Sequence, residues 1–210
     1  MNVEVLSVTT DKPLSLIGTV AGTSYGKSDT SIDRAKRCFN AGHLSVFEHV
    51  NVTWRIEGIS RACSHQLVRH RLASYCQKSQ RYTKLDKEAT RWYALPLGLV
   101  EKAVPDAIAE YKVFMEQALE QYLRLLDMGI AAEDARYVLP EATCTDISMT
   151  MNLREFINFY KLRSDKSAQR EIRDLSSILL GHLRSISDEF KEFVEMLCES
   201  VEKDYVCIDL

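Results

Sequence analysis

The sequence predicts an α+β fold, in which a single helix-rich domain carries a small, mostly antiparallel sheet. Apolar residues alternate with polar ones in two short segments of the first sixty residues, and this period of two is typical of strands. From residue 105 onward, apolar residues recur at helical spacing over long segments. No internal repeat, low-complexity tract or linker interrupts the 210 residues. We therefore expect one domain over residues 1–210, which is a usual length for a single core.

Two strands and one short helix are predicted in the first third of the chain. The segment 2–8 (NVEVLSV) alternates and predicts a short strand. The segment 50–57 predicts a half-buried strand, because its apolar residues share one face: Val50, Val52, Trp54 and Ile56. Gly58 is expected to end this strand. Ser60 is a candidate N-cap for a helix over residues 60–71.

Two further helices have clear end signals. The segment 28–43 begins with hydroxyl and aspartate capping candidates and has Gly42 where a helix would stop. The clearest helix runs from Pro105 to Met128. A proline suits its first turn, and Gly129 stands where a C-terminal glycine is favoured.

The last third of the chain also predicts helices. A short one stops at Pro140, and two more are expected at roughly 150–163 and 168–199. The second of these carries a continuous apolar stripe, which we interpret as core or subunit interface: Ile172, Leu175, Leu179, Leu183, Ile186, Phe190, Phe193 and Met196.

The composition excludes several broad classes. A net charge of −3 argues against a general nucleic-acid or membrane-surface binder. No apolar run approaches the roughly 20 residues that cross a bilayer, and the N-terminus lacks the pattern of a signal peptide, so a cytoplasmic location is expected. The six cysteines form no C-x-x-C pair, and the histidines have no i, i+4 spacing, so no metal site is expected.

One segment departs from this acidic average. Between Arg61 and Arg81 there is no acidic residue, and the run from Arg69 contains five basic or imidazole side chains: Arg69, His70, Arg71, Lys78 and Arg81. On a helix, Arg69 and Arg71 would lie about 200° apart and could not grip one phosphate together. The serines and glutamines downstream of Ser74 suit a loop that surrounds a polar ligand.

The basic segment leaves three interpretations open. It could be a solvated basic face, a site for a nucleotide or other phosphate ligand, or a site for RNA, although RNA binding usually requires more aromatic platforms. The chain contains neither a P-loop nor a Rossmann glycine motif. A nucleotide would therefore have to be held by side chains in another arrangement.

The order of the basic and hydroxyl residues carries a family resemblance. Arg69-His70-Arg71 followed by Ser79 and Arg81 is similar to the R-H-R…S-x-R signature of the flavin-dependent thymidylate synthases. Further matches run in the same order along the chain, at residues 41–50, 134–140 and 152–173. The resemblance therefore covers most of the sequence.

The resemblance implies an enzyme, a methyltransferase that makes dTMP from dUMP. The carbon would come from methylenetetrahydrofolate and the reducing equivalents from NADPH through bound FAD. It also implies a homotetramer with active sites at subunit interfaces, and neither nucleic acid nor membrane as a partner. The family uses no cysteine nucleophile, so Cys76 is not expected to attack the substrate. Two competing readings are a binding module without catalysis and a flavin-dependent methyltransferase that acts on RNA.

The resemblance also assigns roles by position. The dUMP-contacting positions are Gln66, Gln77, Ser79, Gln80, Arg81, Arg136 and Arg163. The FAD-contacting positions are Ser24, His43, Ser45, Glu48, Arg69, His70, Arg71, Asn152, Arg154, Asn158 and Leu162. Within these sets, Arg163, Ser79 and Arg81 are the expected catalytic residues. Arg81 and Arg136 would bind the phosphate, and Arg163 would stabilise the negative charge that builds on the pyrimidine.

Overall fold

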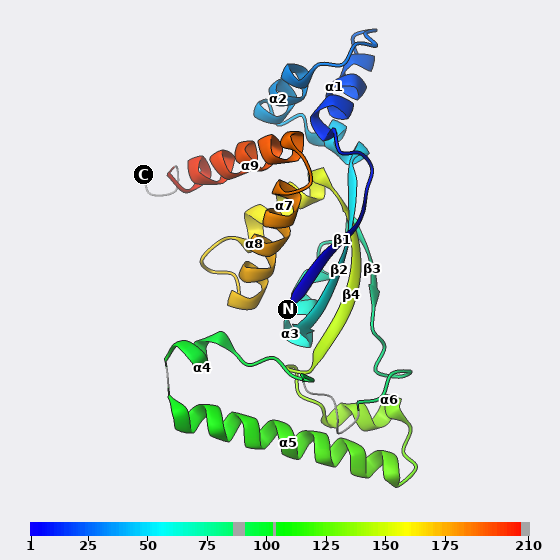
Figure 1. The fold of residues 1–210 in the computed structure, drawn as a ribbon, viewed down its shortest axis with the longest axis vertical. Coiled ribbons are helices and arrows are strands. Elements are labelled where there is room, and N and C mark those ends of the chain that lie inside the picture. Colours follow the sequence, from blue (N-terminus) through cyan, green and yellow to red (C-terminus); the bar gives the residue numbers. More distant parts are fainter. Residues whose placement is uncertain (86–90, 103, 207–210) are drawn as a thin grey trace. The chain divides into compact units, whose positions relative to one another are not determined.

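The computed structural model describes residues 1–85, 91–102 and 104–206 (Figure 1). The chain forms two compact units. Unit 1 comprises Met1–Asn2, Ile56–Arg69 and Tyr75–Ser148, and unit 2 comprises Val3–Arg55, His70–Ser74 and Met149–Leu210. The expectation of a single domain over residues 1–210 stays a prediction.

A four-stranded antiparallel sheet has the strand order β1-β2-β4-β3. Its strands are β1 (Asn2–Val8), β2 (Asn51–Ser60), β3 (Ala73–Gln77) and β4 (Cys144–Asn152). Each of these strands contributes residues to both units. Together with the many helices, this sheet confirms the predicted α+β class.

Unit 2 contains most of the helices and a large aromatic core. Its elements are α1 (Pro13–Thr23), α2 (Ile32–Asn40), the 3-10 helix η1 (Leu44–His49), α7 (Leu153–Arg163), α8 (Arg170–Arg184) and α9 (Asp188–Val206). The rings of Phe39, Phe47 and Phe193 meet in the core with centroids 5.8 to 6.4 Å apart. Trp54 of β2 stacks on Phe156 of α7, which joins the strand to that helix.

Unit 1 contains a smaller core around a long helix. Its elements are α3 (Arg61–Leu67), α4 (Leu97–Glu101), α5 (Pro105–Asp127), α6 (Ala132–Ala135) and the 3-10 helix η2 (Arg136–Val138). Trp92 packs with Met115 and Ala118 of α5 in a buried cluster. Among the described residues, no helix has both the length and the apolar character that a bilayer crossing requires.

Several predicted ends are confirmed in detail. The Ser31 hydroxyl caps α2, and the Ser60 hydroxyl caps α3 by accepting a hydrogen bond from Cys63 N. Gly42 and Gly129 have φ of 72° and 84°, which is the left-handed conformation that glycine adopts without strain. The alternating apolar face of β2 is fully buried, as its pattern indicated.

Three predictions around the sheet are wrong, and one strand was missed. The helix after Ser60 ends at Leu67 instead of residue 71, and the polar run after Ser74 begins as strand β3, not as a loop. Gly58 does not end β2, because its φ of 70° lets the strand continue with a local distortion. The strand β4 was not foreseen, although it buries every second residue.

The prediction of one long C-terminal helix is also wrong. It is two helices, α8 and α9, which are separated at Ser185–Ser187. Most side chains of the predicted apolar stripe are buried, and Ile172 and Phe193, for example, are both 0% exposed. The stripe is therefore core, and it gives no reason to expect a subunit interface there. The helices α1 and α4 were not predicted.

Candidate functional site

Unit 1 holds six of the seven residues that the sequence assigned to dUMP, and unit 2 holds the seventh, Arg163. The six occupy the last turn of α3, the end of β3, the turn that follows it and the junction of α6 with η2: Gln66, Gln77, Ser79, Gln80, Arg81 and Arg136. Within this unit, residues that are far apart in the sequence are brought close together.

Arg81 and Arg136 converge on one residue of α6. The Nε–H of Arg81 donates to Glu133 Oε2 at 2.7 Å, and the Nε–H of Arg136 donates to the backbone oxygen of Glu133 at 3.0 Å. Arg81 is about half exposed, so this surface ion pair orients the side chain and contributes little stability. The two cations expected to bind a phosphate are thus neighbours.

Arg61 adds a third cation that the sequence analysis missed. Its Nη2 donates to the backbone oxygen of Lys78 at 3.0 Å, and its buried Nε has no hydrogen-bond partner among the described residues. Burial lowers the pKa of Arg61, the positive charge of Arg136 lowers it further, and Glu141 opposes the shift. A group of guanidinium ions whose charges disfavour one another is a suitable environment for an anion. The signal in the sequence was the position of Arg61 at the start of the acid-free segment.

Hydrogen bonds order Gln77 at the end of β3 and Ser79 in the turn that follows it. Gln77 donates its amide protons to Ser64 Oγ at 2.9 Å and to Thr145 Oγ1 at 3.3 Å, so a carbonyl acceptor is what it can offer to a ligand. The Ser79 hydroxyl accepts a hydrogen bond from the backbone N–H of Arg81 at 3.2 Å. Cys76 is exposed and, because side chains alternate along a strand, it lies on the opposite face from Gln77.

Unit 2 holds all the residues assigned to FAD except Arg69, which is an exposed residue of unit 1. Arg154, Asn158 and Leu162 follow one another at intervals of four along α7 and are all exposed. Arg154 forms an ion pair with Glu48 of η1, and this contact ties the stripe on α7 to the helix that carries Ser45. His43 precedes η1 as its N-cap residue.

The composition of this surface fits a flavin. Hydrogen-bonding side chains suit the ring edge and the phosphates, and Leu162, which is 54% exposed, offers an apolar contact for a ring face. Asn152 instead caps α7, since its side chain accepts a hydrogen bond from Glu155 N at 2.9 Å. The structure thus brings the α7 and η1 members of the set together.

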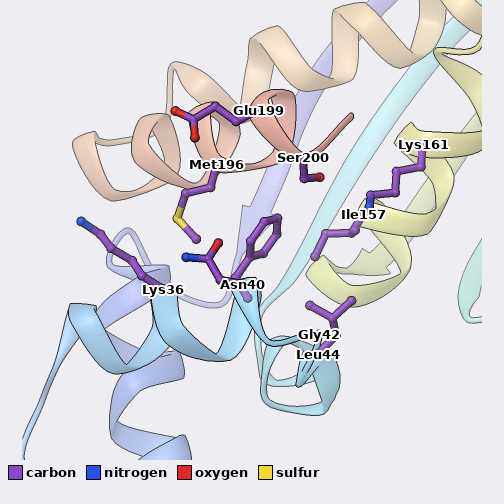
Figure 2. Close-up of a pocket in the computed structure, with 10 residues that line it drawn as sticks. Lys36, Asn40, Gly42, Leu44, Ile157, Lys161, Met196, Glu199 and Ser200 are labelled. Atoms are coloured by element: carbon purple, nitrogen blue, oxygen red, sulfur yellow. The ribbon is translucent and has the colours of Figure 1, made fainter. Parts of the chain in front are cut away.

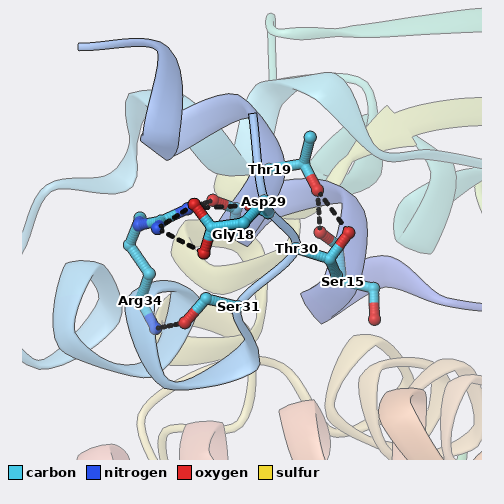
Figure 3. Close-up of polar contacts among 7 residues, drawn as sticks. All are labelled: Ser15, Gly18, Thr19, Asp29, Thr30, Ser31 and Arg34. Atoms are coloured by element: carbon cyan, nitrogen blue, oxygen red, sulfur yellow. Dashed lines mark hydrogen bonds and ion pairs between the residues drawn. The ribbon is translucent and has the colours of Figure 1, made fainter. Parts of the chain in front are cut away.

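Ser24 is the C-cap residue of α1 and precedes a turn that Arg34 holds in place (Figure 3). The buried Arg34 guanidinium donates to the backbone oxygens of Gly18 and Asp29 at 2.7 and 3.1 Å and to both carboxylate oxygens of Asp29. These bonds hold the pKa of Asp29 below its ordinary value. The turn between α1 and α2 is therefore fixed from its interior, and Ser24 itself is exposed on it.

His70, the middle residue of the basic signature, is buried, with 4% of its surface exposed. Its Nδ1 lies 3.1 Å from Glu155 Oε1, and its Nε2 accepts a hydrogen bond from Arg163 Nε at 2.9 Å. Glu155, which is 5% exposed, also accepts a hydrogen bond from Asn158 Nδ2 at 3.3 Å. Glu155 does not stand out in the sequence, because one acidic residue at a helix start resembles an ordinary N-terminal carboxylate.

A separate pocket of about 570 Å³ lies in unit 2 (Figure 2). It is lined by α2, the turn after it, α7 and α9, and its walls carry Lys36, Asn40, Lys161, Met196 and Glu199. None of the residues assigned to FAD or dUMP lines it. It adjoins the candidate site in the sequence at two places. Gly42 and Leu44 flank His43, and Ile157 and Lys161 directly precede Asn158 and Leu162.

Comparisons with known proteins agree with the motif. The profile of the family described as "Thymidylate synthase complementing protein" matches residues 4–187. A flavin-dependent thymidylate synthase of Thermococcus kodakarensis is 40% identical over 198 residues, which are 89% of this chain and 80% of that protein. Another, from Geobacter sulfurreducens, is 44% identical over 154 residues, which are 72% of this chain and 64% of that protein.

A solved structure agrees as well. The flavin dependent thymidylate synthase ThyX from Helicobacter pylori, complexed with FAD and dUMP, matches with a TM-score of 0.71 and 25% identity. The match covers 90% of this chain and 99% of that one. With the fold, the arginine cluster and the α7 surface in place, these similarities establish that the chain is an enzyme of the flavin-dependent thymidylate synthase family, a family of methyltransferases.

Proposed function

We propose that this enzyme converts dUMP to dTMP, with methylenetetrahydrofolate as carbon donor, NADPH as reductant, bound FAD as redox cofactor and no cysteine nucleophile. The observation that carries the proposal is the arginine cluster of unit 1, in which Arg81 and Arg136 meet on Glu133 and Arg61 lies close to Arg136. Such a cluster suits the phosphate of a nucleotide. The related Helicobacter pylori protein, crystallised with FAD and dUMP, supports the same pair of ligands.

In this proposal, Arg81 and Arg136 bind the dUMP phosphate. The remaining members of the nucleotide set, Gln66, Gln77, Ser79 and Gln80, supply hydrogen bonds to sugar and base. The ordered turn at Ser79 keeps its hydroxyl and the Arg81 side chain in a fixed relation, because that hydroxyl accepts from the Arg81 amide. Preorganisation of this kind lowers the entropy lost on binding.

Arg163 acts on the pyrimidine. A guanidinium beside a carbonyl oxygen stabilises the negative charge that develops as C5 of the ring becomes nucleophilic. Because this interaction strengthens along the reaction, it favours the transition state more than the bound substrate. Electrostatic activation of this kind requires no covalent attack by the enzyme, which agrees with the placement of Cys76 on the face of β3 opposite Gln77.

FAD is held, in this proposal, by the surface of α7 and η1 together with the exposed arginines of the signature. Arg154, Asn158 and Leu162 provide the α7 stripe, and His43, Ser45 and Glu48 provide the η1 side. Arg69, Arg71 and Ser24 complete the set, and Asn152 fixes the start of α7. The bound flavin would carry reducing equivalents from NADPH to the one-carbon unit.

We further propose a cytoplasmic homotetramer. Exposed apolar side chains on and after α5, among them Val113 at 52%, Phe114 at 57% and Met128 at 76%, support association between copies. Light scattering of the FAD-loaded protein tests this, and a monomer that retains FAD would contradict it.

The proposed reaction is tested by supplying dUMP, methylenetetrahydrofolate, NADPH and FAD and measuring dTMP. The purified protein should be yellow, whereas a binding module without catalysis should be colourless. Omission of dUMP, methylenetetrahydrofolate or NADPH should abolish product. Methylation of an RNA substrate in place of dUMP would support the alternative enzyme and overturn the proposal.

A further inference from the structure

One face of α7 carries three side chains that all meet His70. Glu155, Phe159 and Arg163 follow at intervals of four, so they lie one above another along the helix. The imidazole ring stands edge-on to the Phe159 ring, with centroids 5.0 Å apart and an angle of 79°. Its two nitrogens reach the outer members of the row, Glu155 at one end and Arg163 at the other.

The identities of these partners determine which nitrogen of His70 carries the proton. A guanidinium N–H only donates, so Nε2 must present its lone pair to Arg163. In neutral imidazole the other nitrogen then carries the hydrogen, and Nδ1–H donates to Glu155 Oε1. An ionised carboxylate only accepts, so Glu155 selects the same tautomer that Arg163 requires.

We propose that Glu155 and His70 are positioning residues for Arg163, with the carboxylate fixing the imidazole tautomer and the imidazole holding the guanidinium through its Nε–H. This inference rests on the proposed action of Arg163 on the pyrimidine. Four of the five N–H donors of Arg163 are carried by its two Nη atoms, and fixing Nε sets the direction of that planar fork.

The electrostatics of the site support this arrangement. Burial is the main cause that lowers the pKa of His70, the hydrogen bond with Glu155 raises it, and the charge of Arg163 lowers it again. The net lowering favours the neutral imidazole, which is the only form that can accept from Arg163. The ring is also held in place, because a rotation of the imidazole would break both hydrogen bonds and its edge-on contact with Phe159.

The test compares Arg163→Ala, Glu155→Gln, His70→Gln and the double variant Glu155→Gln/His70→Gln in the FAD-loaded enzyme. Glu155→Gln keeps the size of the side chain but adds a donor, so it no longer selects one tautomer. We expect single-turnover dTMP formation to fall by about tenfold, while the Kd for dUMP changes little. In His70→Gln an amide oxygen can take the place of Nε2, so part of the rate should remain. In the double variant, Glu155→Gln should cause no loss beyond that of His70→Gln, because the imidazole that Glu155 orients is no longer there.

A spectroscopic measurement tests the tautomer without relying on turnover. In protein labelled with ¹⁵N-histidine, the signal that disappears in His70→Gln belongs to His70. In the wild type it should report a protonated Nδ1 and an unprotonated Nε2. In Glu155→Gln the share of the other tautomer should rise, because Arg163 alone then favours the wild-type form. Ser176→Ala, at a buried hydroxyl of α8 that donates to the backbone oxygen of Arg173, controls for general loosening of unit 2.

The outcomes separate the inference from the proposed function. If Arg163→Ala is impaired while Glu155→Gln and His70→Gln turn over like wild type, the positioning role is overturned and the role of Arg163 stands. Losses that simply add in the double variant would also overturn it, as would a His70 signal with a protonated Nε2. Wild-type rates in Arg163→Ala would instead overturn the role of Arg163 itself, together with any need to position it.

Discussion

Replacing Gly18 with alanine should destabilise the protein through a backbone clash in the turn between α1 and α2. A Cβ on Gly18 would lie 2.0 Å from the backbone oxygen of Ser31, which no side-chain movement can relieve. The turn must therefore shift, and the hydrogen bond from Arg34 to the Gly18 oxygen shifts with it (Figure 3).

The expected magnitude combines two opposing effects. Overpacking of a well-packed site costs about 1–3 kcal/mol, and a backbone contact this short belongs at the upper end. Alanine in place of a helical glycine raises the free energy of unfolding by roughly 1 kcal/mol, because alanine has the higher helix propensity. The net loss in the free energy of unfolding should therefore be about 1–2 kcal/mol.

Gly181→Ala is the matched control, since Gly181 is also helical and nothing lies within 4 Å of a Cβ built there. It gains the propensity without the clash and should stabilise the protein by roughly 1 kcal/mol. Urea unfolding of both variants at equal protein concentration measures the difference. If Gly18→Ala were as stable as Gly181→Ala, the packing of the turn described above would be wrong. If Gly18→Ala bound FAD more weakly and Gly181→Ala did not, the turn would be linked to FAD binding through Ser24.

Three other predictions concern the site. Arg163→Ala should slow single-turnover dTMP formation by on the order of tenfold to a few hundredfold, because a charged hydrogen bond is worth roughly 1.5–3 kcal/mol; Arg163→Lys should recover only part, and unchanged rates in both would refute the assignment. Cys76→Ser should keep substantial activity, and a loss of turnover with FAD and dUMP binding intact would restore a covalent route. Because the pKa of His70 is lowered in the fold, the unfolded chain binds the extra proton first, so the urea midpoint should fall as pH drops below the ordinary value of 6.5. This dependence should be weaker in His70→Gln, and an equal dependence would contradict a neutral, buried His70.

Local patterns predicted the elements whose signals are local. The caps at Ser31 and Ser60 and the glycine after α5 were recognised because each acts on backbone groups within a few residues. The strand β4 was missed, although Ile147, Met149 and Met151 alternate, because its pattern merged with the helical pattern that follows. The break between α8 and α9 was missed because the apolar stripe continues in phase across it.

The candidate site shows a similar division. The family motif pointed to the exposed residues of α7 and the arginines near Glu133, since each belongs to a recognisable pattern, and their roles stay predictions. Neither Arg61 nor Glu155 could be identified that way. Their proposed roles depend on residues that the fold brings near them, Arg136 for Arg61 and His70 for Glu155, at separations of 75 and 85 positions in the chain. Electrostatic neighbourhoods of this kind become visible only in three dimensions.

The helix α7 has a consequence for how this enzyme can change over time. Arg154, Asn158 and Leu162 form one row, and Glu155, Phe159 and Arg163 form a second row displaced by one residue, which on a helix is a rotation of about 100°. The angle between the row that faces the proposed flavin and the row that contacts His70 is therefore fixed by helical geometry alone. A single inserted or deleted residue between Asn152 and Arg163 would rotate every later residue of the helix by about 100° relative to the earlier ones. Each row would then be split between two faces of the helix. Substitutions within either row are individually testable, whereas a change of length would disturb both at once, so the spacing of this segment should tolerate less variation than its composition.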